Sequence, residues 1–141
     1  MKAIHLLTAL SVLCPALAWS NPVHNIWSTR GFYVSEPGSS ATPASANISF
    51  SWTEGTGLAF SNGQATTPAG DRYEFQLVSV TSNTTSSGIQ GLWNVSKNGA
   101  PLCTGCVGHA YGFGAVGTYF KIYVDGERYH LSGYVTSRYD Y

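Results

Sequence analysis

The sequence predicts an all-β protein, built as one antiparallel β-sandwich or small β-barrel domain over residues 19–141. Only 10% of the residues are charged, whereas Gly, Ser, Thr and Tyr are abundant, a balance typical of extracellular β-rich proteins. No window carries apolar residues at helical spacing over three turns, because Gly, Pro and β-branched residues interrupt each candidate helix. Several segments instead alternate apolar and polar residues, as half-buried strands do.

Residues 1–18 are predicted to be a secretory leader rather than part of this domain. A basic residue, Lys2, precedes an apolar run over 3–13, and the small-residue exit Ala-Leu-Ala follows, which is the order found in a cleaved signal peptide. Cleavage is expected after Ala18 or Ser20, so the mature protein is expected to be extracellular. The apolar run is shorter than the roughly 20 residues that span a bilayer, and we expect no membrane span.

The charge balance argues against one class of partner. The chain has seven basic and seven acidic side chains, and losing Lys2 with the leader leaves six basic side chains against seven acidic ones. Proteins that bind nucleic acid or anionic lipid carry a basic footprint. We therefore expect no nucleic-acid partner.

Three segments predict the central strands. Residues 48–52 place Ile, Phe and Trp on one face and two serines on the other, and residues 73–77 repeat this pattern with Tyr, Phe and Leu. Val78 and Val80 then switch the alternation, which predicts either a β-bulge near Leu77 or a strand covered on both faces. Residues 89–95 are expected to form a further strand that ends before a Lys-Asn-Gly turn.

Loops and a C-terminal hairpin complete the expected six or seven short strands. Residues 37–45 and 61–70 are rich in Pro, Gly, Ser and Ala and are predicted to be loops. Asp125-Gly126 separates two alternating runs, as the turn of a hairpin does. The apolar face of that hairpin is predicted to be core. Its opposite, polar and aromatic face carries Tyr119, Lys121, Tyr123, His130 and Tyr134.

The two cysteines of the expected mature chain, Cys103 and Cys106, predict a small disulfide loop, because an oxidising compartment favours pairing. The same spacing occurs in redox dithiols and in half of a zinc site. A redox motif needs a helix start at its first cysteine, and zinc needs two further ligands, and the sequence supplies neither pattern. The glycine-rich segment 108–117 is followed by no helix that would hold a phosphate, so we expect a strand or a bend with closely approaching backbones.

Three Asn-X-Ser/Thr sequons favour a eukaryotic, fungal glycoprotein. They begin at Asn47, Asn83 and Asn94. Asn83 is the preferred glycan site, because residues 82–88 are expected to form a polar turn where a sugar would project into water.

The predicted function is non-enzymatic binding of an extracellular host protein or cell-wall glycan, with no cofactor and no metal. Exposed Trp and Tyr stack on sugar rings and are enriched at interfaces. The aromatic candidates are Trp27, Trp93, Tyr111, Tyr119, Tyr123 and Tyr134, with Trp93 expected in the core. The binding residues we select from the hairpin face are Tyr119, Tyr123, His130 and Tyr134. The alternative is a small secreted hydrolase of glycosidase or ribonuclease type, which needs an acid–base pair in one cleft and would use Glu74, Arg128 and His130.

Short strand patterns carry a family resemblance. They are Asn-Ile-Trp-Ser-Thr-Arg-Gly-Phe-Tyr-Val at 25–34, Ala-Asn-Ile-Ser-Phe-Ser-Trp at 46–52 and Tyr-Phe-Lys-Ile-Tyr-Val at 119–124. The order resembles small fungal secreted proteins, above all the β-barrel family of the Alternaria major allergen and related plant-response elicitors. That resemblance implies a surface-acting effector or elicitor without enzymatic activity, and it transfers no functional residue. The long-range disulfides of that family have no counterpart here, where only Cys103 and Cys106 are expected to pair.

Overall fold

A computed structural model describes residues 23–53, 57–84, 88–112 and 116–140. The predicted leader and both of its cleavage positions lie outside these residues. Nine strands occupy most of the described chain: β1 (Val23–Ser35), β2 (Thr42–Thr53), β3 (Gly57–Thr66), β4 (Arg72–Thr84), β5 (Gly88–Lys97), β6 (Ala100–Tyr111), β7 (Tyr119–Val124), β8 (Tyr129–Tyr134) and β9 (Ser137–Asp140). They are more numerous, and several are longer, than the six or seven short strands that the sequence predicts.

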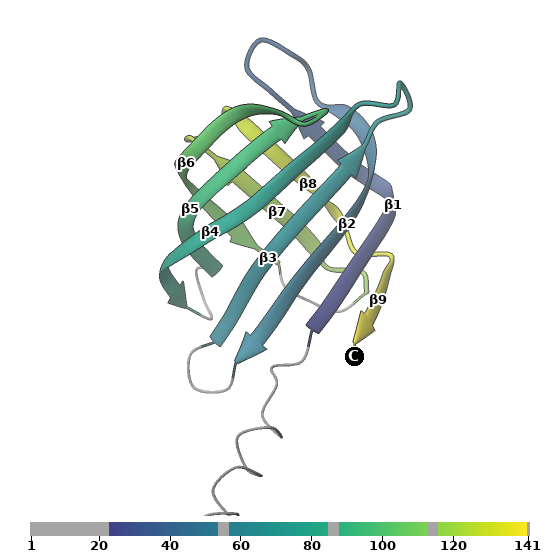
Figure 1. Ribbon diagram of the computed structural model, residues 1–141. Helices are drawn as coiled ribbons and strands as arrows, with labels where there is room; N and C mark the ends of the chain where they lie inside the picture. The colour runs from purple at the N-terminus through teal and green to yellow at the C-terminus, as the bar shows by residue number, and fades with distance from the viewer. Residues whose placement is uncertain (1–22, 54–56, 85–87, 113–115, 141) are drawn as a thin grey trace, which may run out of the picture.

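Eight of these strands close into an antiparallel barrel (Figure 1). Neighbours follow the order of the chain from β2 to β8, and β1 closes the ring by pairing with β2 on one edge and β8 on the other. The long β1 also pairs through its first half with β9, so β8 and β9 share one edge of it. Of the two architectures that the sequence predicts, the protein adopts the barrel.

The core fills the barrel with the apolar face of each strand. On β7, Phe120, Ile122 and Val124 are fully buried, and their neighbours in the sequence point outward, as the two-residue period of a strand requires. Trp93 of β5 is also fully buried, which confirms its predicted place in the core. The largest buried side chains are Trp93, Phe32, Phe75, Phe120, Ile48, Ile89, Ile122, Leu131, Val34 and Val95.

The loops lie where expected but are shorter than expected. The predicted loop 61–70 is wrong over its first half, because β3 continues to Thr66 and only 67–71 connect β3 to β4. Gly63 pairs with Ile48 of β2 and Phe75 of β4, so pairing on both edges overrides the local Asn-Gly turn signal. The predicted loop 37–45 likewise shortens to 36–41.

Two turns confirm the sequence pattern. Asn98 and Gly99 connect β5 to β6 with φ of 52° and 82°, the positive values that a tight hairpin of type I′ needs. Asp125 and Gly126 have φ of 57° and 68° and begin the turn between β7 and β8. Both turns and the loops 36–41 and 67–71 lie at one end of the barrel, which we call the turn end.

The alternation change after Leu77 is a β-bulge. The pairing of β4 with β5 shifts register between Leu77 and Ser79 and again between Val80 and Ser82. Val78 is 57% exposed. The sequence left open a bulge or a strand covered on both faces, and the structure selects the bulge.

The glycine-rich segment 108–117 was expected to form a strand or a bend with closely approaching backbones, and its residues up to Gly112 include both a strand and such an approach. Gly108 belongs to β6, and a Cβ there would lie 2.5 Å from Cδ1 of the buried Trp93. Gly112 follows β6 with φ +81°, and a Cβ there would overlap the Tyr119 carbonyl. The glycines therefore allow β6 to approach Trp93 and the start of β7 closely.

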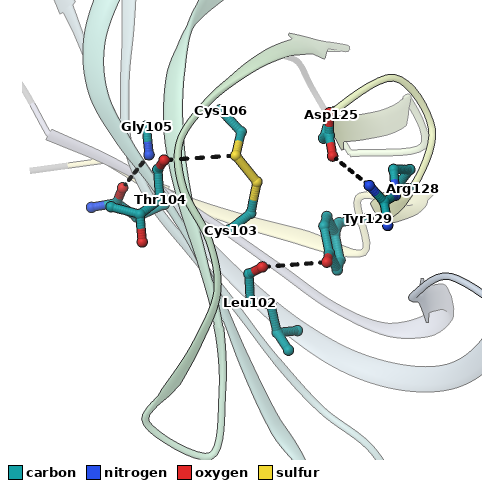
Figure 2. The surroundings of a disulfide bond; sticks show 9 residues. Leu102, Cys103, Thr104, Gly105, Cys106, Asp125, Arg128 and Tyr129 are labelled. Atoms are coloured by element: carbon teal, nitrogen blue, oxygen red, sulfur yellow. Dashed lines mark hydrogen bonds and ion pairs between the residues drawn. A yellow bond between two sulfur atoms is a disulfide. The ribbon is translucent and has the colours of Figure 1, made fainter.

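The predicted Cys103–Cys106 disulfide forms, within a strand rather than at a turn (Figure 2). The pairing of β5 with β6 shifts register on both sides of the Val95 and Cys103 pair, so β6 bulges there. The Asn94 side-chain oxygen accepts a hydrogen bond of 2.9 Å from the Gly105 amide inside this bulge. The disulfide and the hydrogen bond together fix the irregular stretch.

That stretch of β6 is also an edge of the sheet. Within the described residues, β6 pairs with β7 only from Gly108 to Tyr111. Before Gly108, two carbonyls of β6 accept isolated hydrogen bonds. The Asp125 amide donates to the Val107 carbonyl, and the Tyr129 hydroxyl donates to the Leu102 carbonyl at 3.3 Å (Figure 2). A bulged, cross-linked edge is a poor template for a further strand.

Candidate functional site

The four predicted binding residues lie on one outer surface of the barrel. Tyr119 and Tyr123 come from β7, and His130 and Tyr134 come from β8. Tyr119 and Tyr134 are 49% and 54% exposed, and the other two are half-buried. Antiparallel pairing sets Tyr119 opposite Tyr134 and Tyr123 opposite His130, so the hairpin brings all four together.

Strand β6 extends this surface with two further rings. His109 pairs with Tyr123, and Tyr111 lies two residues along the same face. The His109 and Tyr123 ring centroids are 5.1 Å apart, and those of Tyr111 and Tyr123 are 5.7 Å apart. The Tyr111 and Tyr123 hydroxyls share a hydrogen bond of 3.0 Å. We call these three residues the triple stack.

A second aromatic contact lies farther from the turn end. The Tyr119 and Tyr134 rings meet edge to face with centroids 5.3 Å apart. We call these two residues the tyrosine pair. Along β7 it is four residues from Tyr123, and strands rise about 3.3 Å per residue, which separates the two aromatic groups by about 13 Å.

Polar side chains occupy the space around these groups. Lys121 lies between Tyr119 and Tyr123 on the same face of β7, with Nζ 4.9 Å from the Tyr123 ring centroid. Ser132 pairs with Lys121, and Tyr33 of β1 pairs with Ser132. We call the whole surface the aromatic face; its residues are Tyr33, His109, Tyr111, Tyr119, Lys121, Tyr123, His130, Ser132 and Tyr134.

His130 lies at the end of this face nearest the turn end, where two serines hold it. Its Nδ1 shares a hydrogen bond of 2.5 Å with the Ser35 hydroxyl, and its Nε2 shares one of 3.1 Å with the buried Ser132 hydroxyl. Burial lowers the pKa of His130 below its ordinary 6.5, and the nearby Lys121 lowers it further, whereas Glu127 opposes this. The imidazole is therefore neutral at neutral pH.

The remaining charges near the face are paired. Lys121 Nζ lies 3.1 Å from a Glu127 carboxylate oxygen, and Arg128 lies 3.2 Å from Asp125. The hydrogen bond with Tyr111, together with burial, raises the pKa of Tyr123 to about 12, so its phenol keeps its proton. The aromatic face thus offers rings, hydroxyls and imidazoles with balanced charge.

The residues of the alternative hydrolase are not brought together. Glu74 lies on β4 and contacts Arg72 at 3.1 Å, and β4 is four strands from β8 around the barrel. Figure 1 shows β4 on the near wall and β8 behind it. Arg128 is close in sequence to His130, but its guanidinium pairs with Asp125 in the turn.

The sequon asparagines lie away from the aromatic face. Asn47 is on β2 and Asn94 is on β5, both half-buried. Asn83 is in the last part of β4, before the undescribed residues 85–87, and its backbone pairs with Ile89. Of the expected turn at 82–88, residues 82–84 belong to β4 and Gly88 to β5, and 85–87 lie outside the described residues. Asn83 is therefore at a strand end.

One further hollow lies outside this surface. It has a volume of about 460 Å³ near the turn end, where β2 begins and β3 ends, and is lined by Pro43, Ala44, Ser45, Thr66, Thr67 and Pro68. No titratable side chain lines it. It lacks the groups that acid–base chemistry requires.

Sequence reasoning missed His109 and Tyr33 as members of the face. The alternation of Val107, His109 and Tyr111 with Gly108 and Ala110 was a usable signal that these side chains share one side of a strand. What the sequence did not reveal was that β6 pairs with β7, and β1 with β8. Those pairings decide which outward side chains become neighbours.

No protein-family model, curated protein or solved structure matches this chain. In the part of the chain that the structure describes, no helix is long and apolar enough to cross a membrane. The same residues contain no group of three or more His, Cys, Asp and Glu side chains placed to hold a metal ion. The chemistry of the aromatic face is therefore the basis for any functional conclusion.

Proposed function

We propose that this chain is a secreted, non-enzymatic binding protein of the effector or elicitor type that engages an extracellular cell-wall glycan through its aromatic face. The observation that carries the proposal is the gathering of the triple stack and the tyrosine pair on one outer surface. Aromatic side chains offer large contact areas at low cost in conformational entropy, and their polar atoms orient a ligand.

The chemistry around the rings supports binding over catalysis. The two imidazole nitrogens of His130 are hydrogen-bonded to serines, Ser35 and Ser132, rather than to a carboxylate. A hydrolase would need an acid and a base converging on one bond, and Glu74 is on a distant strand. The barrel is also consistent with the resemblance to the Alternaria allergen-like family, whose members are β-barrels, and we propose a fungal origin on the same grounds.

The test is binding of the purified mature protein to an array of cell-wall polysaccharides. Tyr134→Ala removes an exposed ring from the face, and Gln76→Ala, an exposed change on β4, is the matched control on the other wall. We expect saturable binding by the wild type and the control, and clearly weaker binding by Tyr134→Ala.

Three outcomes would overturn the proposal. Equal binding by Tyr134→Ala and wild type would remove the aromatic face as the site. Release of reducing ends or nucleotides that depends on His130 would favour the hydrolase. Capture of a host protein with no polysaccharide bound would replace the glycan with a protein partner.

A further inference from the structure

We infer that the ligand of the aromatic face is a neutral, linear oligosaccharide chain that lies along β7 and contacts the triple stack and the tyrosine pair at the same time. This inference rests on the proposed function. It adds the charge of the ligand, its length and its direction on the barrel.

We infer a neutral ligand because the basic side chains on and beside the face are already paired with carboxylates. Lys121 is paired with Glu127, and Arg128 with Asp125. Ligands that carry many anionic groups, such as nucleic acids and acidic polysaccharides, are held by unpaired Lys and Arg. The aromatic face instead offers the phenol hydroxyls of exposed tyrosines and the half-buried imidazole of His109, which match the hydroxyl groups of a neutral sugar.

The length of the oligosaccharide follows from the distance between the triple stack and the tyrosine pair. Tyr119 and Tyr123 project from the same face of β7, about 13 Å apart along the strand. One sugar ring stacked on the triple stack cannot reach the tyrosine pair across that distance. A chain of several sugars can reach both.

The direction of the oligosaccharide follows from the rows of outward-facing side chains on β7, β8 and β1. Lys121 lies between the two aromatic groups on the outward side of β7, so a chain running along β7 passes over its ammonium group between the stacking contacts. The exposed Tyr33, beside Ser132, borders the same path. Chains running across the strands would meet only one aromatic group.

The two contacts should act together. Once one end of a chain is bound, its other end is held close to the second group at a high effective concentration. We expect hexasaccharides to bind about tenfold or more tightly than disaccharides. Truncating the tyrosine pair should reduce hexasaccharide affinity to the disaccharide value and leave disaccharide binding on the triple stack unchanged.

The experiment is calorimetric titration of the full mature chain with neutral cello-, laminari- and chito-oligosaccharides of increasing length, with polygalacturonate as the acidic comparison. The variants are Tyr134→Ala, Tyr134→Phe and the control Gln76→Ala. The Phe variant keeps the ring and should retain length dependence. Sedimentation of each protein alone monitors self-association.

The outcomes separate this inference from the proposed function. Binding that is equal for short and long oligosaccharides, but still weaker in Tyr134→Ala, would overturn the extended binding mode and leave glycan binding by the aromatic face intact. Binding that is unchanged in Tyr134→Ala at every length would overturn both. Tighter, salt-sensitive binding of polygalacturonate would overturn neutrality. A dimer that Tyr134→Ala dissociates would assign the face to a second copy of the chain. Failure of every carbohydrate to bind would overturn both the inference and the proposed glycan ligand.

Discussion

Lys97 and Glu36 meet across the turn end of the barrel, with the Lys97 Nζ 2.7 Å from a Glu36 carboxylate oxygen. Lys97 ends β5 and Glu36 follows β1, strands that are opposite each other in the closed order. The same oxygen accepts a hydrogen bond of 3.1 Å from the Tyr73 hydroxyl, and the Lys97 ammonium lies 5.2 Å from the Tyr73 ring centroid. These three side chains join opposite walls above the core.

This cluster predicts acid sensitivity. The hydrogen bond from Lys97 holds the pKa of Glu36 below its usual 4.5, although burial opposes the shift. Because the folded pKa is lowered, the associated stability is present above the unfolded pKa and is lost as pH falls through the folded value. Urea unfolding between pH 6 and pH 3, a range chosen around the ordinary pKa of a carboxyl, should show stability falling more steeply for wild type than for Glu36→Gln. Parallel curves would contradict a role for this carboxylate.

Tyr73→Phe tests the neutral member of the cluster. It removes the hydroxyl that donates to Glu36 and keeps the buried ring. We expect a loss of about 1 kcal/mol in the free energy of unfolding. In a Glu36→Gln background the same change should cost less, because the carboxylate acceptor has gone. Additive effects of the two changes would show that the hydroxyl acts independently of the carboxylate.

Removing the disulfide should lower the free energy of unfolding modestly and should increase self-association. Cys103 and Cys106 are three positions apart, and closing so short a loop is worth about 2 kcal/mol in the chain-entropy account. The double variant Cys103→Ser, Cys106→Ser should lose stability of about this size. It should also self-associate more readily, because the β6 edge is no longer fixed in a bulge. Denaturant unfolding and light scattering measure the two effects, and reduced wild type is the matched comparison. A variant that is both monomeric and as stable as wild type would remove this role.

Gly112 and Gly117 form a matched pair for backbone strain. Both have positive φ, of 81° and 93°, but only Gly112 has backbone atoms of β7 where a Cβ would be placed. Gly117→Ala should cost about 1 kcal/mol for conformation alone. Gly112→Ala should cost about 3 kcal/mol, because it also displaces the backbone at Tyr119. Equal losses in thermal or urea unfolding would show that the close approach of Gly112 to β7 has no energetic effect.

His130 predicts a second pH dependence. Its folded pKa is lowered, chiefly by burial, so protonation favours the unfolded chain and stability falls as pH drops below about 6.5. The groups that face it are Lys121, Tyr123, Glu127, Ser35 and Ser132. An NMR titration of the imidazole should give a midpoint below 6.5. His130→Gln should remove this component of the pH dependence, and a midpoint above the ordinary value would contradict it.

The sequence by itself determined several of the strands and which side of each faces the core. Alternation at residues 119–124 placed Phe120 inside and Tyr119 and Tyr123 outside, and the structure confirms it. The two-residue period of a strand is local, so neighbouring residues suffice to read it. The Asp-Gly turn, the disulfide and the change of alternation after Leu77 were equally local signals.

Only the tertiary structure decided that the sheet closes into a barrel and which outward side chains lie side by side. Pairing of β1 with both β2 and β8 made a barrel instead of a sandwich, and pairing of β6 with β7 placed His109 and Tyr111 beside Tyr123. The same order separated Glu74 from His130 and brought Lys97 to Glu36. These contacts join residues far apart in the chain, and they depend on how all the apolar faces are buried together, which no local pattern encodes.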